Sequence, residues 1–210
     1  MQLVVCCTEA QQEELTRNSV AELASVVWVF EKVDLLHYKT ADAVIDLLYE
    51  NNKVNNSLLR QLSGLKIINC VTDTLQETDP SFVRINGWTT FLSAPILEAT
   101  CLHEDLKKLA EAVFATFHKT IEWLPDEPGF VVPRVVSMII NEAYFALEEG
   151  VSTRAEIDVA MKLGTAYPFG PFEWSEKIGV RNIATLLRKL SIQQPRYTPA
   201  PLLLQMADAI

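Results

Sequence analysis

Glycine is scarce in the first part of this chain, where the first of its seven glycines is Gly64. A dinucleotide-binding loop needs glycines for its tight turn, for close approach of the backbone to the pyrophosphate and for helix–strand packing. The segment after the first apolar run reads CCTEAQQ, which would place side chains, including the charged Glu9, against a pyrophosphate at a helix start. The sequence therefore predicts that no cofactor is held there in the usual manner.

Cysteine and histidine are also few, and neither is spaced as metal ligands are. The four cysteines, which form no CxxC pair, are Cys6, Cys7, Cys70 and Cys101. The three histidines are scattered along the chain, at His37, His103 and His118. These spacings indicate neither a disulfide framework nor a zinc site. We expect no bound metal, and we interpret the cysteines as small buried residues of a cytoplasmic protein.

Basic charge and long apolar runs are lacking as well. The net charge is -9, which disfavours binding to nucleic acid or to an anionic membrane surface. No apolar run reaches the roughly 18 residues of a membrane span, and the first residues show no basic signal-peptide region. With 49% hydrophobic and 21% charged residues, the composition is that of a folded globular protein.

Residues 1–125 alternate between short apolar runs and helical patterns. Strands are predicted at 3–7, 26–30, 43–48, 65–70 and 120–124, with weaker patterns at 83–88 and 96–102. Helices are predicted around 53–62 and 104–119, and a polar helix-forming segment, EAQQEEL, follows the first strand. This alternation predicts a mostly parallel sheet with helices on its faces, in a reduced Rossmann-like domain.

Residues 126–210 have no strand pattern and predict an all-helical domain. A helix over 129–149 is apolar on nearly every side, which predicts burial in a core or an oligomer interface. Thr153 and Glu156 have the spacing of a capping box for the next helix, which ends at Gly164. Further helices are predicted at 170–177, 182–190 and 201–209. The expected fold class is α/β followed by all-α, with the boundary near residues 125–128.

The order and spacing of several motifs resemble the 3-hydroxyacyl-CoA dehydrogenase family. In the C-terminal half these are PGFVVPR, NEA, EEGV, IDVAMKLG and PFGPFE; in the N-terminal half, ADAVIDLLYENNKVNNSLL and RINGWTTFLSAP. The resemblance implies NAD-dependent oxidation of 3-hydroxyacyl-CoA to 3-oxoacyl-CoA and a helical domain that forms the dimer. It also implies a ribose-binding acid, whose position at the end of the second strand is taken by Glu31.

The catalytic positions that the resemblance implies hold other residue types here. In register, Thr89 replaces the histidine that acts as general base, Cys101 the glutamate that orients it, Asp73 a serine and Pro133 an asparagine. A threonine hydroxyl does not accept a proton near neutral pH as imidazole does. We therefore expect a short, degenerate family member that is redox-inactive and that needs no NAD.

Three alternatives remain open from the sequence. The chain could be an active NAD-dependent 3-hydroxyacyl-CoA dehydrogenase; it could use Asp73 or Cys101 in different chemistry; or His103 could replace the missing base. The expected partners are a second copy of the chain, in a homodimer, and an acyl-CoA ligand.

Overall fold

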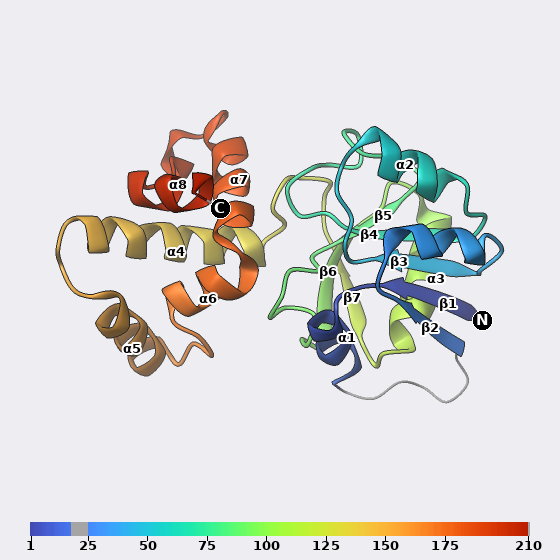
Figure 1. Cartoon of the computed structure of the whole chain (residues 1–210), viewed down its shortest axis with the longest axis horizontal. Helices are drawn as coiled ribbons and strands as arrows, with labels where there is room; N and C mark the ends of the chain where they lie inside the picture. The colour runs from blue at the N-terminus through green and yellow to red at the C-terminus, as the bar shows by residue number, and fades with distance from the viewer. Residues whose placement is uncertain (18–24, 210) are drawn as a thin grey trace. The chain divides into compact units, whose positions relative to one another are not determined.

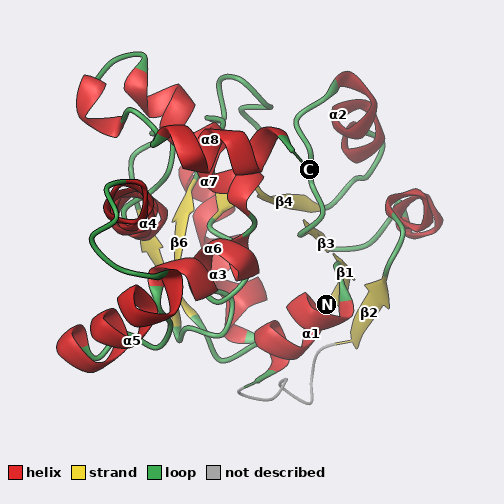
Figure 2. Cartoon of the chain, turned by 60° about the vertical axis from the view of Figure 1, so that its left-hand side comes forward, coloured by secondary structure: helices red, strands yellow, loops and turns green. Residues whose placement is uncertain are grey.

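The computed structural model describes residues 1–17 and 25–209, which divide into two compact units, Met1–Phe130 and Val131–Ile210. The first unit combines strands and helices, and the described part of the second contains helices alone (Figure 1). Figure 2 distinguishes the strands, in yellow, from the helices, in red. The predicted fold class, α/β followed by all-α, is confirmed.

One seven-stranded sheet forms the first unit, in the order β2-β1-β3-β4-β5-β6-β7. The strands are β1 (Gln2–Cys6), β2 (Ser25–Val29), β3 (Ala43–Asp46), β4 (Leu65–Asn69), β5 (Val83–Ile85), β6 (Ile96–Thr100) and β7 (Thr120–Trp123). Five of the six strand pairs are parallel, as predicted. The exception is β5–β6, which is antiparallel with Arg84 opposite Thr100. Strand β5 is also shorter than the predicted 83–88, since residues 86–88 begin a loop.

Helices and apolar side chains cover both faces of this sheet. The helical elements are α1 (Glu9–Thr16), the 3₁₀ helix η1 (Lys32–Tyr38), α2 (Lys53–Arg60) and α3 (Glu104–Ala115). Alternate residues of each strand belong to opposite faces, so β1 gives Leu3 and Val5 to one apolar cluster and Val4 and Cys6 to another. A parallel sheet buried on both sides explains why these strands read as continuous apolar runs.

The second unit is built from α4 (Val132–Glu148), α5 (Arg154–Thr165), α6 (Pro171–Ile178), α7 (Val180–Ser191), η2 (Pro195–Tyr197) and α8 (Pro201–Asp208). The predicted capping box of Thr153 and Glu156 is present at the start of α5. Among the described residues, no helix combines the length and apolar character that crossing a membrane requires.

A buried carboxylate explains the PFGPFE motif at the start of α6. Asp158 on α5 accepts hydrogen bonds from the backbone N–H of Phe172, at 2.8 Å, and of Glu173, at 3.3 Å. A Cβ atom on Gly170 would lie 2.2 Å from Asp158 Oδ1, so the close approach of the two elements requires glycine. Asp158 therefore acts as the cap of α6.

Candidate functional site

Five parallel strands end at one edge of the sheet. They are β2, β1, β3, β4 and β5, whose last residues are Val29, Cys6, Asp46, Asn69 and Ile85. Strand β1 pairs with β2 on one side and with β3 on the other. The order in which the strands follow one another across the sheet therefore reverses at β1. Ligands of doubly wound sheets bind at this carboxyl edge, next to such a switch point. The candidate site is therefore the group of loops that follows these five strands.

The loop between β1 and α1 is closed by a capping box. Thr8 Oγ1 accepts a hydrogen bond from Gln11 N at 3.2 Å, and Thr8 N donates to Gln11 Oε1 at 2.9 Å. The sequence T-x-x-Q contains this signal, although we did not predict the box. Because the box occupies N–H groups that a helix start can offer to a phosphate, fewer remain for a pyrophosphate. Glu31, predicted from the resemblance to take the place of the ribose-binding acid, is exposed just after β2.

Asp46, at the end of β3, is a buried carboxylate beside the switch point. Its exposed fraction is 1%, and burial raises the pKa of Asp46 from 3.8 to about 6. The charge of Lys32 and a hydrogen bond from Leu48 N, at 3.0 Å, act in the opposite direction. Cys6 pairs with Asp46 across β1 and β3, and burial together with that carboxylate raises the pKa of the Cys6 thiol to about 12. A thiol of this kind is a weak nucleophile near neutral pH.

Thr89 lies in the loop after β5, next to a residue with unusual backbone geometry. Thr90 has a φ of 84°, which a β-branched residue seldom adopts. Its N–H donates to both carboxylate oxygens of Glu14 on α1, at 2.9 Å each. These hydrogen bonds join the loop that contains Thr89 to helix α1, which follows β1.

Sequence reasoning missed Glu98, a carboxylate at the same edge. It lies in β6 opposite Asn86, whose Nδ2 donates to Glu98 Oε2 at 3.1 Å and whose N donates to Glu98 O at 3.0 Å. Asn69, at the end of β4, accepts a hydrogen bond from Gly87 N at 3.0 Å. The sequence signal that could have indicated this residue is that Glu98 is the single charged side chain in the strand ILEAT.

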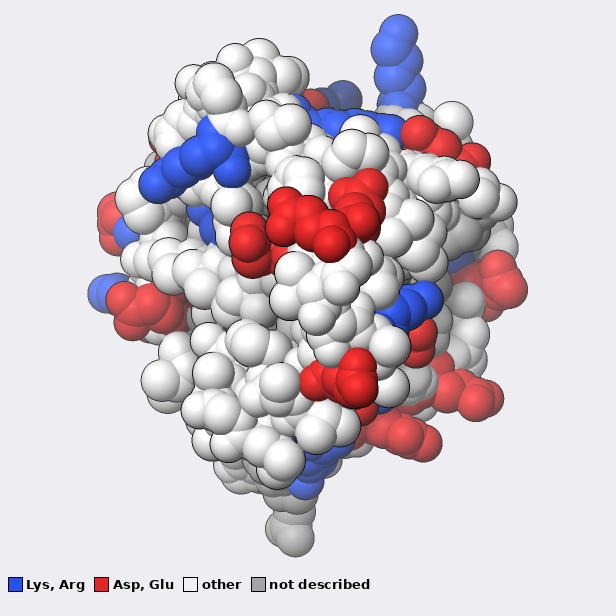
Figure 3. Space-filling model, turned by 90° about the vertical axis from the view of Figure 1, so that its left-hand side faces the viewer, with Lys and Arg blue, Asp and Glu red and all other residues white. Residues whose placement is uncertain are grey.

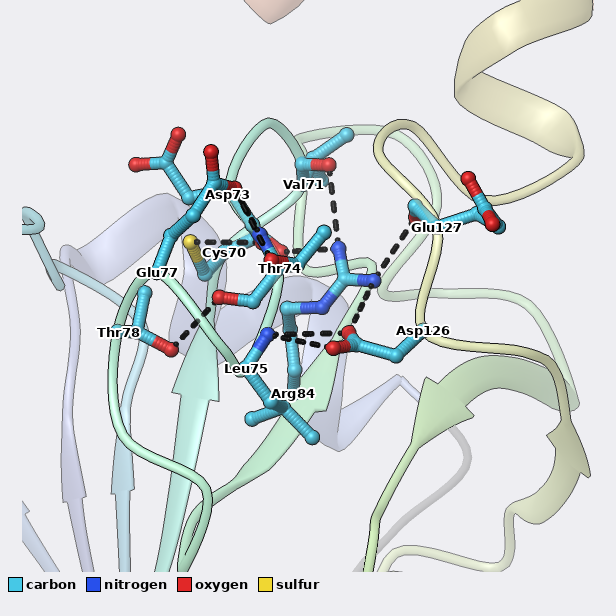
Figure 4. A network of polar contacts seen from close by, with 10 residues as sticks. All are labelled: Cys70, Val71, Asp73, Thr74, Leu75, Glu77, Thr78, Arg84, Asp126 and Glu127. Atoms are coloured by element: carbon cyan, nitrogen blue, oxygen red, sulfur yellow. Dashed lines mark hydrogen bonds and ion pairs between the residues drawn. The ribbon is translucent and has the colours of Figure 1, made fainter.

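Asp73 lies in the loop after β4, at the same edge as Thr89. Asn51 Nδ2, from the loop after β3, donates to Asp73 Oδ2 at 3.0 Å. Figure 4 shows the Asp73 carboxylate at the outer side of its loop, near that of Glu77. The loops after β3 and β4 are therefore joined by direct polar contacts.

Cys101 does not share this edge. Because β6 runs antiparallel to β5, with Thr100 opposite Arg84, Cys101 follows toward the amino end of β5 while Thr89 lies beyond its carboxyl end. Cys101 Sγ interacts with the backbone of His103, and burial raises the pKa of its thiol. His103 is exposed at the start of α3, so the structure places neither residue beside Thr89.

Pro133 belongs to the second unit, in the first turn of α4. A proline is well tolerated there because the N–H groups of the first turn lack partners within the helix. All four cysteines are free thiols; Cys6, Cys7 and Cys70 are buried, as predicted, whereas the prediction was wrong for Cys101, which is only partly buried just after β6. No cluster of three or more His, Cys, Asp or Glu side chains suited to a metal occurs among the described residues.

Comparison with known proteins identifies relatives of the chain. Residues 129–210 match the model of a protein family that is described as "3-hydroxyacyl-CoA dehydrogenase, C-terminal domain". The 3-hydroxyadipyl-CoA dehydrogenase of Escherichia coli is 44% identical over 91 residues, which cover 42% of this chain and 19% of that protein. The probable 3-hydroxyacyl-CoA dehydrogenase B0272.3 of Caenorhabditis elegans is 28% identical over 91% of this chain and 70% of its own length. The chain thus spans much less than the full length of the first relative.

A solved structure confirms the arrangement of elements. The (S)-3-hydroxybutyryl-CoA dehydrogenase PaaH1 of Ralstonia eutropha aligns with a TM-score of 0.74 and 22% identity, over 99% of this chain and 93% of that one. At this identity the likeness establishes the fold.

The expectation that no cofactor is needed was wrong for this family. The relatives are dehydrogenases, and oxidation of a hydroxyl group requires an acceptor for the hydride. NAD is the acceptor in the family that the sequence resembles, and the switch point beside β1 and the acid Glu31 are features that fit such a cofactor. With its motifs, its helical domain and relatives that align with 91% and 96% of the chain in agreement, the chain belongs to the 3-hydroxyacyl-CoA dehydrogenase family.

Proposed function

We propose that this chain is a family member that does not oxidise 3-hydroxyacyl-CoA, and that it binds acyl-CoA and forms a homodimer through its helical domain. The observation that supports the loss of activity is the absence of imidazole from the loops after β4 and β5. The chain has three histidines, His37, His103 and His118; all are exposed, and none lies in residues 70–82 or 86–95.

The effect of losing a positioned general base on the reaction rate is known in order of magnitude. General-base catalysis contributes about 10²–10⁴-fold to the rate, and a threonine hydroxyl does not supply it. The Thr90 N–H is hydrogen-bonded to Glu14, so the backbone beside Thr89 is also held in place by this contact. The proposal concerns proton abstraction by this chain and leaves NAD as the family's cofactor.

The test separates catalysis from binding. The purified full-length chain is assayed for NAD-dependent oxidation of 3-hydroxybutyryl-CoA, and its affinity for acetoacetyl-CoA is measured by calorimetry. We expect binding without turnover. Turnover by the unmodified chain would refute the proposal, and it would direct attention to Glu98, which lies at the carboxyl edge of β5 next to Asn86.

A double variant tests the same reasoning from the opposite direction. Thr89→His with Cys101→Glu restores the two residue types that the family uses, yet we expect it to remain inactive. The physical reason is that β6 carries Cys101 away from the carboxyl edge of β5, so the new glutamate would not orient the new histidine. Thr89→His alone is the matched control, and an increase in activity specific to the double variant would contradict this account.

Exposed apolar side chains on α4 and on α5 support the homodimer. Val135 on α4 and Val159 and Leu163 on α5 have exposed fractions of 54%, 51% and 83%, and Val131, just before α4, has 55%. Val131 and Val135, like Val159 and Leu163, are four residues apart and therefore share a helix face. Figure 3 shows a face on which uncharged surface, in white, lies between separate acidic and basic groups. A second copy of the chain would remove this apolar area from water.

Oligomeric state provides the measurement. Light scattering of the native chain at micromolar concentration should give a dimer mass, and Leu163→Glu should shift the mass toward the monomer. Ile192→Glu is the control, because Ile192 is 84% exposed but lies after α7, outside α4 and α5. A monomeric native chain, or equal dissociation by both substitutions, would count against the assignment.

A further inference from the structure

Strand β5 contains a fully buried arginine. Arg84 is 0% exposed at the centre of β5, between Val83 and Ile85, which are also buried. Its ion-pair partner, Asp126, lies after β7 and has a side chain that is 10% exposed. A buried charge pair is weak evidence for stability because desolvation opposes the attraction between the charges, so its contacts must show what it does.

The guanidinium group joins two segments that are far apart in sequence. Arg84 Nη1 donates to the carbonyls of Cys70, at 3.1 Å, and Val71, at 3.3 Å. Arg84 Nη2 donates to Asp126 Oδ1, at 3.0 Å, and to Glu127 O, at 2.9 Å (Figure 4). The same group lies 4.3 Å from the centre of the Phe130 ring. Arg84 therefore contacts both the loop after β4 and the segment 126–130.

Asp126 completes the connection from the other side. Its two carboxylate oxygens accept hydrogen bonds from Leu75 N, at 3.0 and 2.9 Å. Gly129 N also donates to Val71 O, at 2.7 Å. The loop is thus held at Cys70 and Val71 on one flank and at Leu75 on the other, and Asp73 lies between these two flanks.

We propose that Arg84 and Asp126 are positioning residues that fix the loop 70–75 against residues 126–130, and thereby fix Asp73 at the carboxyl edge of the sheet. Residues 70–75 have no helix or strand structure of their own. Charge-assisted hydrogen bonds from a planar, multidentate guanidinium group give such a segment a defined geometry that apolar contacts alone would not. This role is independent of whether the chain oxidises a substrate.

Hydrogen exchange of the full chain tests the role. In Arg84→Met, Asp126 loses its buried partner, and we expect amides of 71–75 to exchange about 10²–10³-fold faster, the ratio that breaking a buried pair implies. Amides of β1 and β3 should change much less. Arg60→Gln is the control, because the Arg60–Asp79 pair lies near the other end of the β4–β5 connection and Arg60 is 60% exposed.

A double variant distinguishes positioning from a general contribution to stability. Replacing a buried ion pair by apolar residues often restores stability, so Arg84→Met with Asp126→Leu should regain the unfolding midpoint of the native chain. If Arg84 and Asp126 position the loop, exchange of residues 71–74 stays fast in this variant. If exchange there returns to the native rate together with stability, the positioning role is wrong.

Asp126→Asn covers the case in which Arg84→Met does not fold. Asparagine keeps an acceptor for Leu75 N but removes the charge that pairs with Arg84. We expect at least tenfold faster exchange at Val71, which lies on the flank that Arg84 holds. Native exchange of residues 71–75 in Asp126→Asn would overturn the proposal.

Discussion

Substitution of Asp46 by asparagine should make the protein more stable near neutral pH. Asp46 is buried at the end of β3, and burial raises its pKa to about 6, compared with 3.8 for an exposed carboxyl. Ionisation is therefore more costly in the folded chain than in the unfolded chain. Asparagine keeps the side-chain oxygen that accepts the hydrogen bond of Leu48 N and removes the ionisation.

The sign and the size of this change in stability follow from the linkage between proton binding and folding. Between pH 3.8 and about 6 the folded chain binds more protons at Asp46 than the unfolded chain does, so this group's contribution to stability is lost as the pH rises. A shift of about two pKa units corresponds to about 3 kcal/mol in total, of which about 2 kcal/mol falls between pH 4 and pH 7.5. The free energy of unfolding of Asp46→Asn, relative to that of the native chain, should rise by this amount over the interval.

The measurement is a series of urea unfolding curves of both proteins between pH 4 and pH 7.5. A constant difference for Asp46→Asn across this pH range would refute the reasoning, because it would mean that burial does not alter the ionisation of this carboxyl.

Two further substitutions test contacts that position the loops and helices. Gly170→Ala should destabilise the protein by about 2–3 kcal/mol in urea unfolding, because its Cβ would lie 2.2 Å from Asp158 Oδ1 and displace the cap of α6. Gly164→Ala, which meets no atom within 4 Å, should be neutral or stabilising, and equal losses from both substitutions would contradict this account. Glu14→Ala should cost about 1.5–3 kcal/mol, because the Thr90 N–H loses a charged acceptor; a loss below ~0.5 kcal/mol would show that the contact is unimportant.

The candidate site was predictable only in part. The resemblance placed Asp73 and Thr89 in loops after β4 and β5, and the parallel strands bring these loops to one edge. The resemblance also gave Cys101 as a site position. Because β6 is antiparallel to β5, however, Cys101 lies toward the amino end of β5, and Glu98 is the β6 residue that lies beside Asn86 at the carboxyl edge. A short apolar strand has the same residue pattern in either direction, so its orientation depends on pairing with strands that are distant in sequence.

Local signals in the sequence determined the elements themselves. Apolar runs specified the strands, the T-x-x-E spacing at Thr153 specified the start of α5, and the loss of strand patterns marked the helical part of the chain. These features depend on residues only a few positions apart. The tertiary structure alone decided that Arg84 and Asp126 meet in the interior and that Asp46 is buried beside Cys6. Burial and ion pairing arise from the packing of segments that are tens of residues apart, and no local pattern contains that information.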